Sequence, residues 1–390
     1  MIDRGIEPVL RELAGKYPVV TITGPRQSGK TTLCRKVFPA MSYANLERPD
    51  TREFALSDPN GFLGSYPNGV ILDEIQRAPH LLSYIQFIVD EAGIPGRFIL
   101  TGSQQLEVLN TVSQSLSGRT ALLKLLPFSM TELGRHYLPP SLDRLLLTGF
   151  YPRIYDQQLD PTQTLGDYVE TYVERDMRQI AAVKDLRLFE KFVRLCAGRI
   201  GQILNLQSLG NDAGVSHTTA RAWVSLLEAS YILFILPPWY RNISKRMIKS
   251  PKLYFYDVGL ASYLLGLENE LHVSRHPLRG NLFENLVIIE ALKYRYNRGR
   301  KSNLHFYRDG KGSEVDLILE VGADVFPIEI KAGQTITSDY LKGLKHFMKI
   351  MPDLLWGTGV IYGGRERQAR SDTRIYPVYD MEEMLNEVGG

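Results

Sequence analysis

Short, largely apolar and β-branched runs recur in the first hundred residues of the chain. They lie at residues 18–23, 69–72 and 97–101. Runs of this length that are bounded by polar or glycine residues predict buried strands. Residues 32–38, which come after the first run, can form a helix, so the pattern predicts an α/β fold.

The middle of the chain, residues 183–240, has helical periodicity and little strand character. Its centre fits a helix-turn-helix, with Gly214 at the tight turn and Ser216 as N-cap of the second helix. Two apolar runs, 231–236 and 253–257, predict two strands after that helix. A helix-turn-helix followed by two strands predicts a winged helix.

A third pattern begins with an apolar-periodic helix at residues 280–290. Because side chains alternate along a strand, Glu329 and Lys331 are expected on the same face of the last of three strands that follow it. The amphipathic segment 340–390 is expected to complete this domain. The three strands are predicted at residues 304–308, 313–320 and 325–331.

A phosphate-binding pattern, GxxxxGK[ST], follows the first predicted strand. Gly24 and Gly29 allow the backbone to turn successive N–H groups onto a β-phosphate, and the helix N-terminus adds partial positive charge. Lys30 would reach the β- and γ-phosphates, and the Thr31 hydroxyl would bind Mg²⁺. The predicted ATP-binding residues are Gly24, Pro25, Arg26, Gln27, Ser28, Gly29, Lys30, Thr31 and Thr32.

Two acids, Asp73 and Glu74, follow the second apolar run. Asp73 is predicted to bind the Mg²⁺ of ATP together with Thr31, directly or through water, and Glu74 to polarise the attacking water. The third strand leads to Ser103 and Gln104. Either could lie between the acids and the γ-phosphate, and either could instead cap a turn.

Several motifs in the first 180 residues resemble the AAA-type ATPases, specifically a prokaryotic branch with a long C-terminal region of unknown function. The resemblance implies a five-stranded doubly wound core with a small helical lid. It also implies that Ser103 or Gln104 is a sensor-like group and that Arg119 is an arginine finger. A finger that acts on the ATP of a neighbouring subunit requires a homo-oligomer. The alternative for Arg119 is a surface salt bridge. The matching motifs include TGPRQSGKTTL, VILDEIQRAPHLLSYIQ, ILTGSQ, SGRTALLKLLPFSMTEL and YVETYVERDMRQI.

A helix Glu284, a strand Asp316, and Glu329 with Lys331 together resemble the PD-(D/E)xK nuclease superfamily, with Val315 where the family name has proline. The resemblance implies a restriction-endonuclease-like α/β domain. Its carboxylates would hold one or two Mg²⁺ ions, and Lys331 would orient or activate the attacking water. Such folds are also kept as DNA-binding or structural modules without cleavage, and both interpretations stay open.

Two basic segments suggest a nucleic-acid partner. The second, residues 293–301, interleaves cations with tyrosines, which suits a nucleic-acid backbone or an exposed solubilising loop. We expect Arg221 on the recognition helix, with Arg246 and Lys249 on the wing, to contact DNA; a packing role for the winged helix is the alternative. The first segment holds Arg241, Lys245, Arg246, Lys249 and Lys252, without an acid.

Composition narrows the class of protein. The 390 residues include 46 Lys and Arg against 43 Asp and Glu, a formal net charge of +3, and 44% are hydrophobic, which is typical of a globular chain. Cys34 and Cys196 supply neither a disulfide framework nor a cysteine-based zinc site, and the histidines form no ligand cluster. We expect a cytoplasmic protein without a signal peptide or membrane span.

The predicted organisation is an ATPase core at 1–135, a helical lid at 136–182, a winged helix at 183–265 and a nuclease-like domain at 266–390. We hypothesise an Mg²⁺-dependent ATPase coupled to a DNA-binding region that could also cleave DNA. The alternative is a nucleotide-controlled switch or oligomeric assembly protein whose nuclease-like domain is inactive and binds protein partners. Arg175-Asp176 matches the ATPase pattern without an assigned role.

Overall fold

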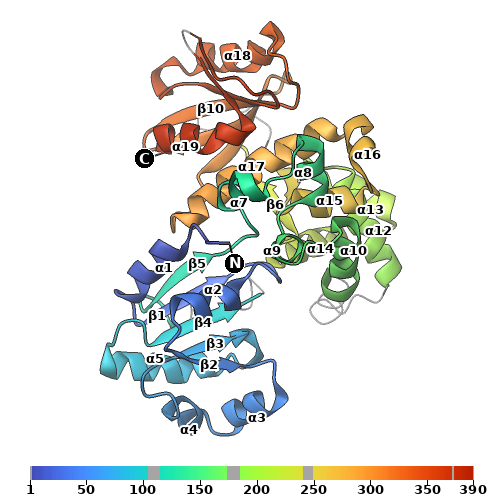
Figure 1. Ribbon diagram of the computed structural model, residues 1–390. Coiled ribbons are helices and arrows are strands. Elements are labelled where there is room, and N and C mark those ends of the chain that lie inside the picture. The colour runs from blue at the N-terminus through green and yellow to red at the C-terminus, as the bar shows by residue number, and fades with distance from the viewer. Residues whose placement is uncertain (1, 104–114, 174–184, 240–248, 371–372, 390) are drawn as a thin grey trace. The chain divides into compact units, whose positions relative to one another are not determined.

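The computed structural model describes residues 2–103, 115–173, 185–239, 249–370 and 373–389 (Figure 1). Gln104, Arg175, Asp176 and Arg246 therefore lie outside the described residues. The chain divides into two compact units. The first comprises residues 1–128, 229–231 and 295–301, and the second comprises residues 129–228, 232–294 and 302–390.

Five parallel strands form the sheet of the first unit, in the order β2-β3-β4-β1-β5, which confirms the predicted α/β fold with a parallel sheet. The strands are β1 (Val19–Thr23), β2 (Ser42–Asn45), β3 (Val70–Asp73), β4 (Phe98–Gly102) and β5 (Thr120–Lys124). The helices are α1 (Glu7–Ala14), α2 (Lys30–Val37), α3 (Pro49–Ser57), α4 (Pro59–Gly64), the 3-10 helix η1 (Ile75–Arg77) and α5 (Leu81–Ala92).

Successive residues of the central strands enter two different cores. Val19 packs in a cluster with residues of α4 and α5, and Val20 in a cluster with residues of α1 and α2. Because helices cover both faces, every position of β1 and β4 is buried, including Thr21, Thr23 and Thr101, and no polar face alternates with an apolar one. The loops after β1, β3 and β4 then lie along one edge of the sheet, where parallel sheets bind ligands.

The second unit begins with helices. In it, α13 ends at Gly214 in a left-handed conformation (φ 85°), and the Ser216 hydroxyl accepts a hydrogen bond from the Thr219 N–H at 3.1 Å before α14. Both local predictions are confirmed. The helices are α7 (Met130–Tyr137), α8 (Leu142–Thr148), α9 (Pro152–Asp156), α10 (Pro161–Tyr168), the π-helix η2 (Val169–Val173), α12 (Leu186–Ala197), α13 (Leu206–Ala213), α14 (His217–Ala229), α15 (Val258–Leu264) and α16 (Glu270–Arg275).

The two strands expected after the helix-turn-helix form an antiparallel pair, β6 (Leu233–Leu236) and β7 (Lys252–Phe255), both shorter than predicted. Tyr231 has a left-handed backbone (φ 57°), which a strand cannot include, so β6 starts later. Asp257 instead caps α15, its carboxylate accepting from the Leu260 N–H at 2.9 Å.

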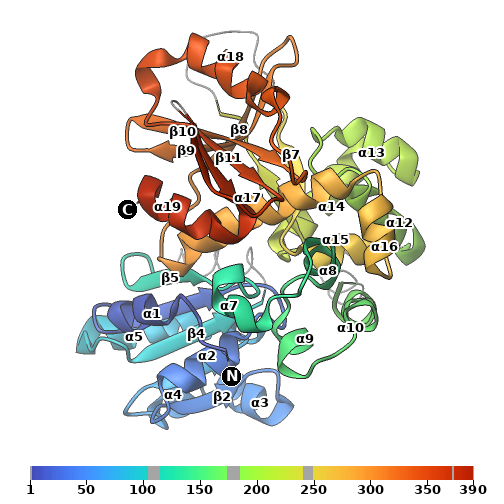
Figure 2. The ribbon, with the colours of Figure 1, turned by 45° about the horizontal axis from the view of Figure 1, so that its top comes forward.

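A six-stranded sheet, in the order β12-β13-β11-β10-β9-β8, follows α17 (Figure 2). Strand β9 is antiparallel to both β8 and β10, and β10 and β11 are parallel. The Trp239 N–H donates to the Phe306 carbonyl at 2.6 Å, so the segment after β6 joins the β8 edge. The elements are α17 (Arg279–Asn297), β8 (Leu304–Arg308), β9 (Glu314–Val321), β10 (Asp324–Lys331), η3 (Ser338–Leu341), α18 (Lys342–Ile350), η4 (Pro352–Leu354), β11 (Gly359–Tyr362), β12 (Gln368–Arg370), β13 (Thr373–Pro377), η5 (Val378–Asp380) and α19 (Met381–Gly389).

Candidate functional site

The loop between β1 and α2 has the backbone of a phosphate-binding loop. Gly29 is left-handed (φ 90°) immediately before α2, and a Cβ added to Gly24 would lie 2.0 Å from the Leu125 carbonyl oxygen, so no side chain fits there. The buried Arg4 holds the loop from behind, donating to the carbonyls of Ser28 at 2.7 Å and Leu126 at 2.6 Å. Sequence analysis missed Arg4 because its partners are 24 and 122 residues away.

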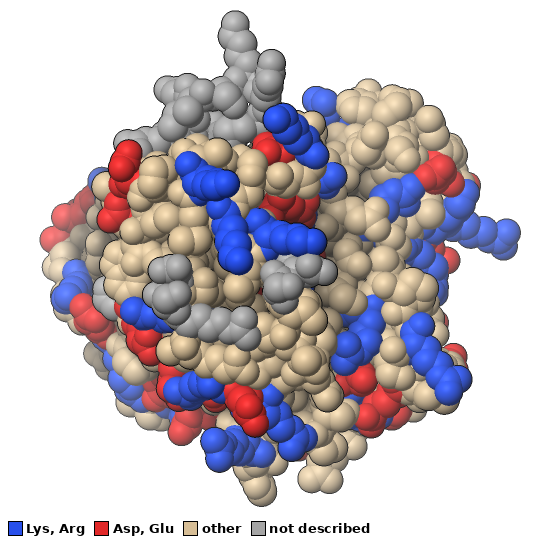
Figure 3. All heavy atoms as spheres, turned by 90° about the horizontal axis from the view of Figure 1, so that it is seen from above, with Lys and Arg blue, Asp and Glu red and all other residues tan. Residues whose placement is uncertain are grey.

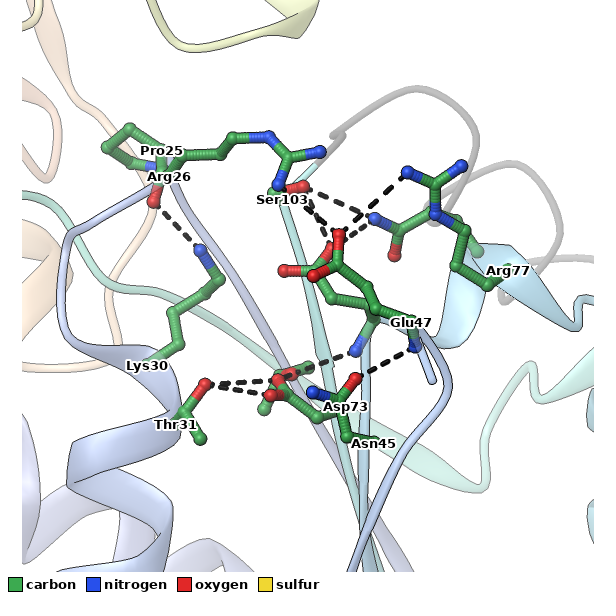
Figure 4. A network of polar contacts seen from close by, with 12 residues as sticks. Pro25, Arg26, Lys30, Thr31, Asn45, Glu47, Asp73, Arg77 and Ser103 are labelled. Atoms are coloured by element: carbon green, nitrogen blue, oxygen red, sulfur yellow. Dashed lines mark hydrogen bonds and ion pairs between the residues drawn. The ribbon is translucent and has the colours of Figure 1, made fainter. Parts of the chain in front are cut away.

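Lys30 and Thr31 start α2 beside the acid that ends β3 (Figure 4). The Lys30 Nζ donates to the carbonyls of Gly24 at 2.9 Å and Pro25 at 2.8 Å, within its own loop. Burial lowers the pKa of Lys30, while Glu74 and Asp73 act in the opposite direction. The Thr31 hydroxyl donates to the Asp73 carboxylate, 2.9 Å from Oδ2. Thr32, in the same turn, is exposed.

Two neighbouring strands orient the Asp73 carboxylate. The Tyr43 hydroxyl donates to Oδ2 at 2.7 Å, and the Thr101 hydroxyl donates to Oδ1. Burial raises the pKa of Tyr43, and its hydrogen bond to Asp73 raises it further, so the phenol remains a donor at neutral pH. Tyr43 and Thr101 were not predicted, because only the pairing of β2 and β4 with β3 brings them to this acid.

Glu74 lies in a left-handed conformation (φ 58°) after β3 and contacts Ser103. The Ser103 hydroxyl donates to Glu74 Oε2 at 2.9 Å, and Gln76 Nε2 donates to the same carboxylate and to Ser103 Oγ at 3.2 Å. Ser103 therefore contacts the second acid, and its sensor-like role stays a prediction. Gln76 was not predicted.

The donor set at the start of α2 fits Mg²⁺. A hydroxyl and a carboxylate, from Thr31 and Asp73, lie within hydrogen-bond distance, and Mg²⁺ prefers such oxygen ligands. Ser28 Oγ, in the loop, is buried without a hydrogen-bond partner among the described residues. Such a hydroxyl costs free energy unless another group contacts it. Arg26 contacts Glu47 at 3.5 Å at the mouth of the loop (Figure 4).

Arg119, expected as an arginine finger, forms an ion pair within its own unit. Its Nη2 donates to Asp90 Oδ2 at 2.8 Å, and its Nε contacts the other oxygen of that carboxylate. This is the salt bridge that sequence analysis gave as the alternative. A finger role stays a prediction and would require this pair to open.

In the second unit, β9 and β10 bring together the predicted Asp316, Glu329 and Lys331. The Lys331 Nζ lies 3.0 Å from Asp316 Oδ2 and 2.6 Å from Glu329 Oε2, so Glu329 and Lys331 do share a face. The Ile330 N–H also donates to Asp316 Oδ2 at 2.8 Å. The strand prediction therefore placed these three residues together.

Glu284 has other partners. The Lys252 Nζ lies 2.8 Å from Glu284 Oε1 and 2.5 Å from Glu314 Oε1, and the Tyr254 hydroxyl donates to Glu284 at 2.5 Å. Lys252 is 2% exposed, so its assignment to an exposed basic wing is wrong. The reason is tertiary: Lys252 begins the buried strand β7, where two carboxylates surround its ammonium. Lys252, Tyr254 and Glu314 were missed as members of this cluster.

The C-terminal carboxylates interact strongly. Burial, together with the charge of Asp316, raises the pKa of Glu329 to about 8 against the opposing effect of Lys331. Burial also favours a higher pKa for Asp316, but Lys331 and Lys252 outweigh it and lower that pKa. Burial raises the pKa of Glu284 although Lys252 opposes the shift. Across the described ranges, no group of three or more His, Cys, Asp or Glu residues is placed so that it could hold a metal ion. A metal-binding role for Glu284, Asp316 and Glu329 stays a prediction.

The predicted DNA contacts are described only in part. Arg221 on α14 and Lys249 before β7 are exposed, and Arg246 lies outside the described residues. In the segment 293–301, Lys293 is buried, 2.8 Å from Glu290, and Tyr294 and Tyr296 are 7% and 8% exposed. These two tyrosines are therefore not exposed, as a surface contact with nucleic acid or a solubilising loop would require. Lys and Arg side chains alternate with acids over much of the face in Figure 3, with several cations together near its centre.

Comparisons with known proteins agree with the fold of the first unit. Residues 16–134 match the family described as "AAA domain". Residues 139–271 and 279–381 match two families described as domains of unknown function, DUF8612 and DUF4143. Within the described part of the chain, the helices are all too short or too polar to cross a membrane.

Similar proteins occur in bacteria. An uncharacterized protein of Mycobacterium tuberculosis is 29% identical over 370 residues, covering 94% of this chain and 81% of its own. A protein of Haemophilus influenzae is 26% identical over 215 residues, covering 51% and 52%. Among solved structures, a Walker-type ATPase of Pyrococcus abyssi has 15% identity and a TM-score of 0.46, covering 68% of this chain and 96% of its own. The first unit is thus an AAA-type P-loop ATPase-like domain in sequence and in sheet topology.

Proposed function

We propose that the protein binds ATP with Mg²⁺ and hydrolyses it. The observation that carries this proposal is the convergence at one sheet edge of the loop from Gly24 to Thr31, Asp73 with its three hydroxyl donors, and the Glu74–Ser103 contact. The phosphates would bind the loop amides and the N-terminus of α2.

Each side chain has a distinct role in this proposal. Thr31 and Asp73 would hold Mg²⁺, which when bound offsets the charge of the β- and γ-phosphates. Lys30 would exchange its loop carbonyls for phosphate oxygens. Glu74, held by Ser103, would orient the attacking water and accept its proton.

Two substitutions test the proposal. Lys30→Ala should abolish binding of a fluorescent ATP analogue, and Glu74→Gln should preserve binding while hydrolysis falls by about 100-fold or more. Lys16→Ala, which removes an exposed ammonium paired with Glu12, is the matched control and should change neither. Unchanged hydrolysis in Glu74→Gln would show that another group orients the water.

DNA engagement by the second unit is the second candidate function. It is supported by the geometry of α13, Gly214 and α14, followed by the β6–β7 pair, which fits a winged helix with Arg221 exposed on its second helix. The helix α17 with Glu284, then β9 with Asp316 and β10 with Glu329 and Lys331, also keep the order of the nuclease pattern.

DNA engagement predicts binding that weakens with salt. Replacing Arg221, Arg246 and Lys249 by alanine should lower the slope of log K against log salt by about 3, one phosphate contact for each residue. Replacing Arg275, Lys345 and Lys349 instead is the control. An unchanged slope, or no binding to duplex DNA, would favour the alternative in which this unit binds protein partners under nucleotide control or holds a homo-oligomer together.

A further inference from the structure

The C-terminal cluster contains one more ammonium group than the nuclease pattern requires. Lys331 belongs to the pattern and pairs with Asp316 and Glu329. Lys252 does not belong to it, comes from another sheet, and lies between the remaining carboxylates, Glu284 and Glu314. Two neighbouring carboxylates in a largely buried site need a compensating positive charge. Lys252 supplies the charge that a metal ion otherwise would.

We propose that the Lys252 ammonium takes the place of a divalent cation in this cluster, so that the nuclease-like sheet binds no metal and does not cleave DNA. The inference goes beyond the proposed ATPase activity and does not depend on it.

Lys252 cannot easily leave this position. It is the first residue of β7, whose pairing with β6 fixes its backbone, and it is 2% exposed. Its Nζ also lies 5.5 Å from the centre of the Phe306 ring, a favourable contact for a cation. Arg308 adds a further cation, 3.2 Å from Glu314. Rotating Lys252 out would leave Glu284 with the Tyr254 hydroxyl but without its ammonium, and Glu314 with Arg308 alone.

Helix α18 packs closely against one of the other carboxylates, Glu329. Gly343, in the first turn of α18, lies so close to β9 and β10 that an added Cβ would be 2.1 Å from Glu329 Oε1 and 2.2 Å from the Glu314 carbonyl. Mg²⁺ usually keeps several water ligands and an octahedral shell. The backbone of α18 occupies one side of the space that such a shell would need.

Mn²⁺ titration tests the proposal. The 390-residue chain is used without nucleotide and with Asp73→Asn, which removes the carboxylate expected to hold Mg²⁺ in the first unit. Mn²⁺ at about 1 mM, roughly 10³ times the dissociation constant of a micromolar site, should leave the melting temperature of this chain unchanged. Adding Lys252→Met should lower the melting temperature, and Mn²⁺ should then restore it by several degrees. Lys252→Arg, which keeps the cation, is the control and should show no Mn²⁺ effect.

Three results would overturn the proposal. One is Mn²⁺ stabilisation of the chain that retains Lys252, lost on adding Asp316→Asn. Another is Mn²⁺- or Mg²⁺-dependent DNA cleavage that Asp316→Asn removes. The third is a folded Lys252→Met chain that Mn²⁺ does not stabilise. If Lys252→Met does not fold, the titration and cleavage assay of the chain that retains Lys252 decide the matter by themselves.

Discussion

Each unit of this protein places lysine beside buried acids, and the two arrangements differ in what the ammonium touches. In the first unit, Lys30 donates to two carbonyls of its own loop, and Asp73 is held by hydroxyl groups. In the second, Lys252 and Lys331 contact the carboxylates directly. Hydroxyl donors leave a carboxylate its charge for a metal, whereas a bound ammonium neutralises it, so the first site is open to Mg²⁺ and the second is already ion-paired.

The largest expected effect is a difference in stability between variants of the two lysines. Lys252→Met should lower the free energy of unfolding by about 3–5 kcal/mol, because it removes the buried ammonium that pairs with the largely buried Glu284 carboxylate. Lys30→Met should lower it by no more than about 1.5 kcal/mol, because only backbone carbonyls lose a donor and water can reach a loop. Urea denaturation without nucleotide measures both. Equal losses would show that the two ammonium groups stabilise their sites in the same way.

The next largest loss of stability is expected where α18 packs against Glu329 and β9. Gly343→Ala should destabilise the protein by about 1–3 kcal/mol, because the new methyl group must displace the Glu329 side chain or the β9 backbone. Gly280→Ala in α17 is the matched control: nothing lies within 4 Å of its added Cβ, so stability should stay constant or rise. A neutral Gly343→Ala would mean that α18 has room to move away.

At the first site, Tyr43→Phe should reduce ATP hydrolysis by about 10-fold, with the loss partly recovered at high Mg²⁺, because the phenol orients the Asp73 carboxylate without touching substrate. Initial rates measured over a range of Mg²⁺ concentrations check this. Tyr17→Phe, on a tyrosine that is 36% exposed, should have no effect. A loss that is independent of Mg²⁺ would place the role of Tyr43 elsewhere.

The second site should also respond to pH. The pKa of Glu329 is raised from 4.5 to about 8, so the folded state favours the protonated form, and stability should fall as pH rises through that interval. Glu329→Gln should remove this decline. Melting temperatures from pH 5 to 9 for both proteins check the sign, and a decline of the same size in Glu329→Gln would assign it to other groups.

The sequence predicted the local features well, because each depends on residues close together in the chain. Gly29 before α2, the Ser216 cap and the shared face of Glu329 and Lys331 all follow from spacing alone. The predictions failed for Lys252 and for the tyrosines of 293–301. A run of cations looks exposed in sequence whether or not a fold buries some of its members.

By itself, the sequence determined the parallel α/β core, the phosphate-binding loop and the acids that end β3, because hydrophobic period and backbone requirements are local. Only the tertiary structure decided which groups surround those acids and which cation neutralises Glu284. Arg4, Tyr43 and Lys252 act on residues 24, 30 and 32 positions away. No local pattern encodes such contacts, because the pairing of strands and the packing of helices bring the charges together.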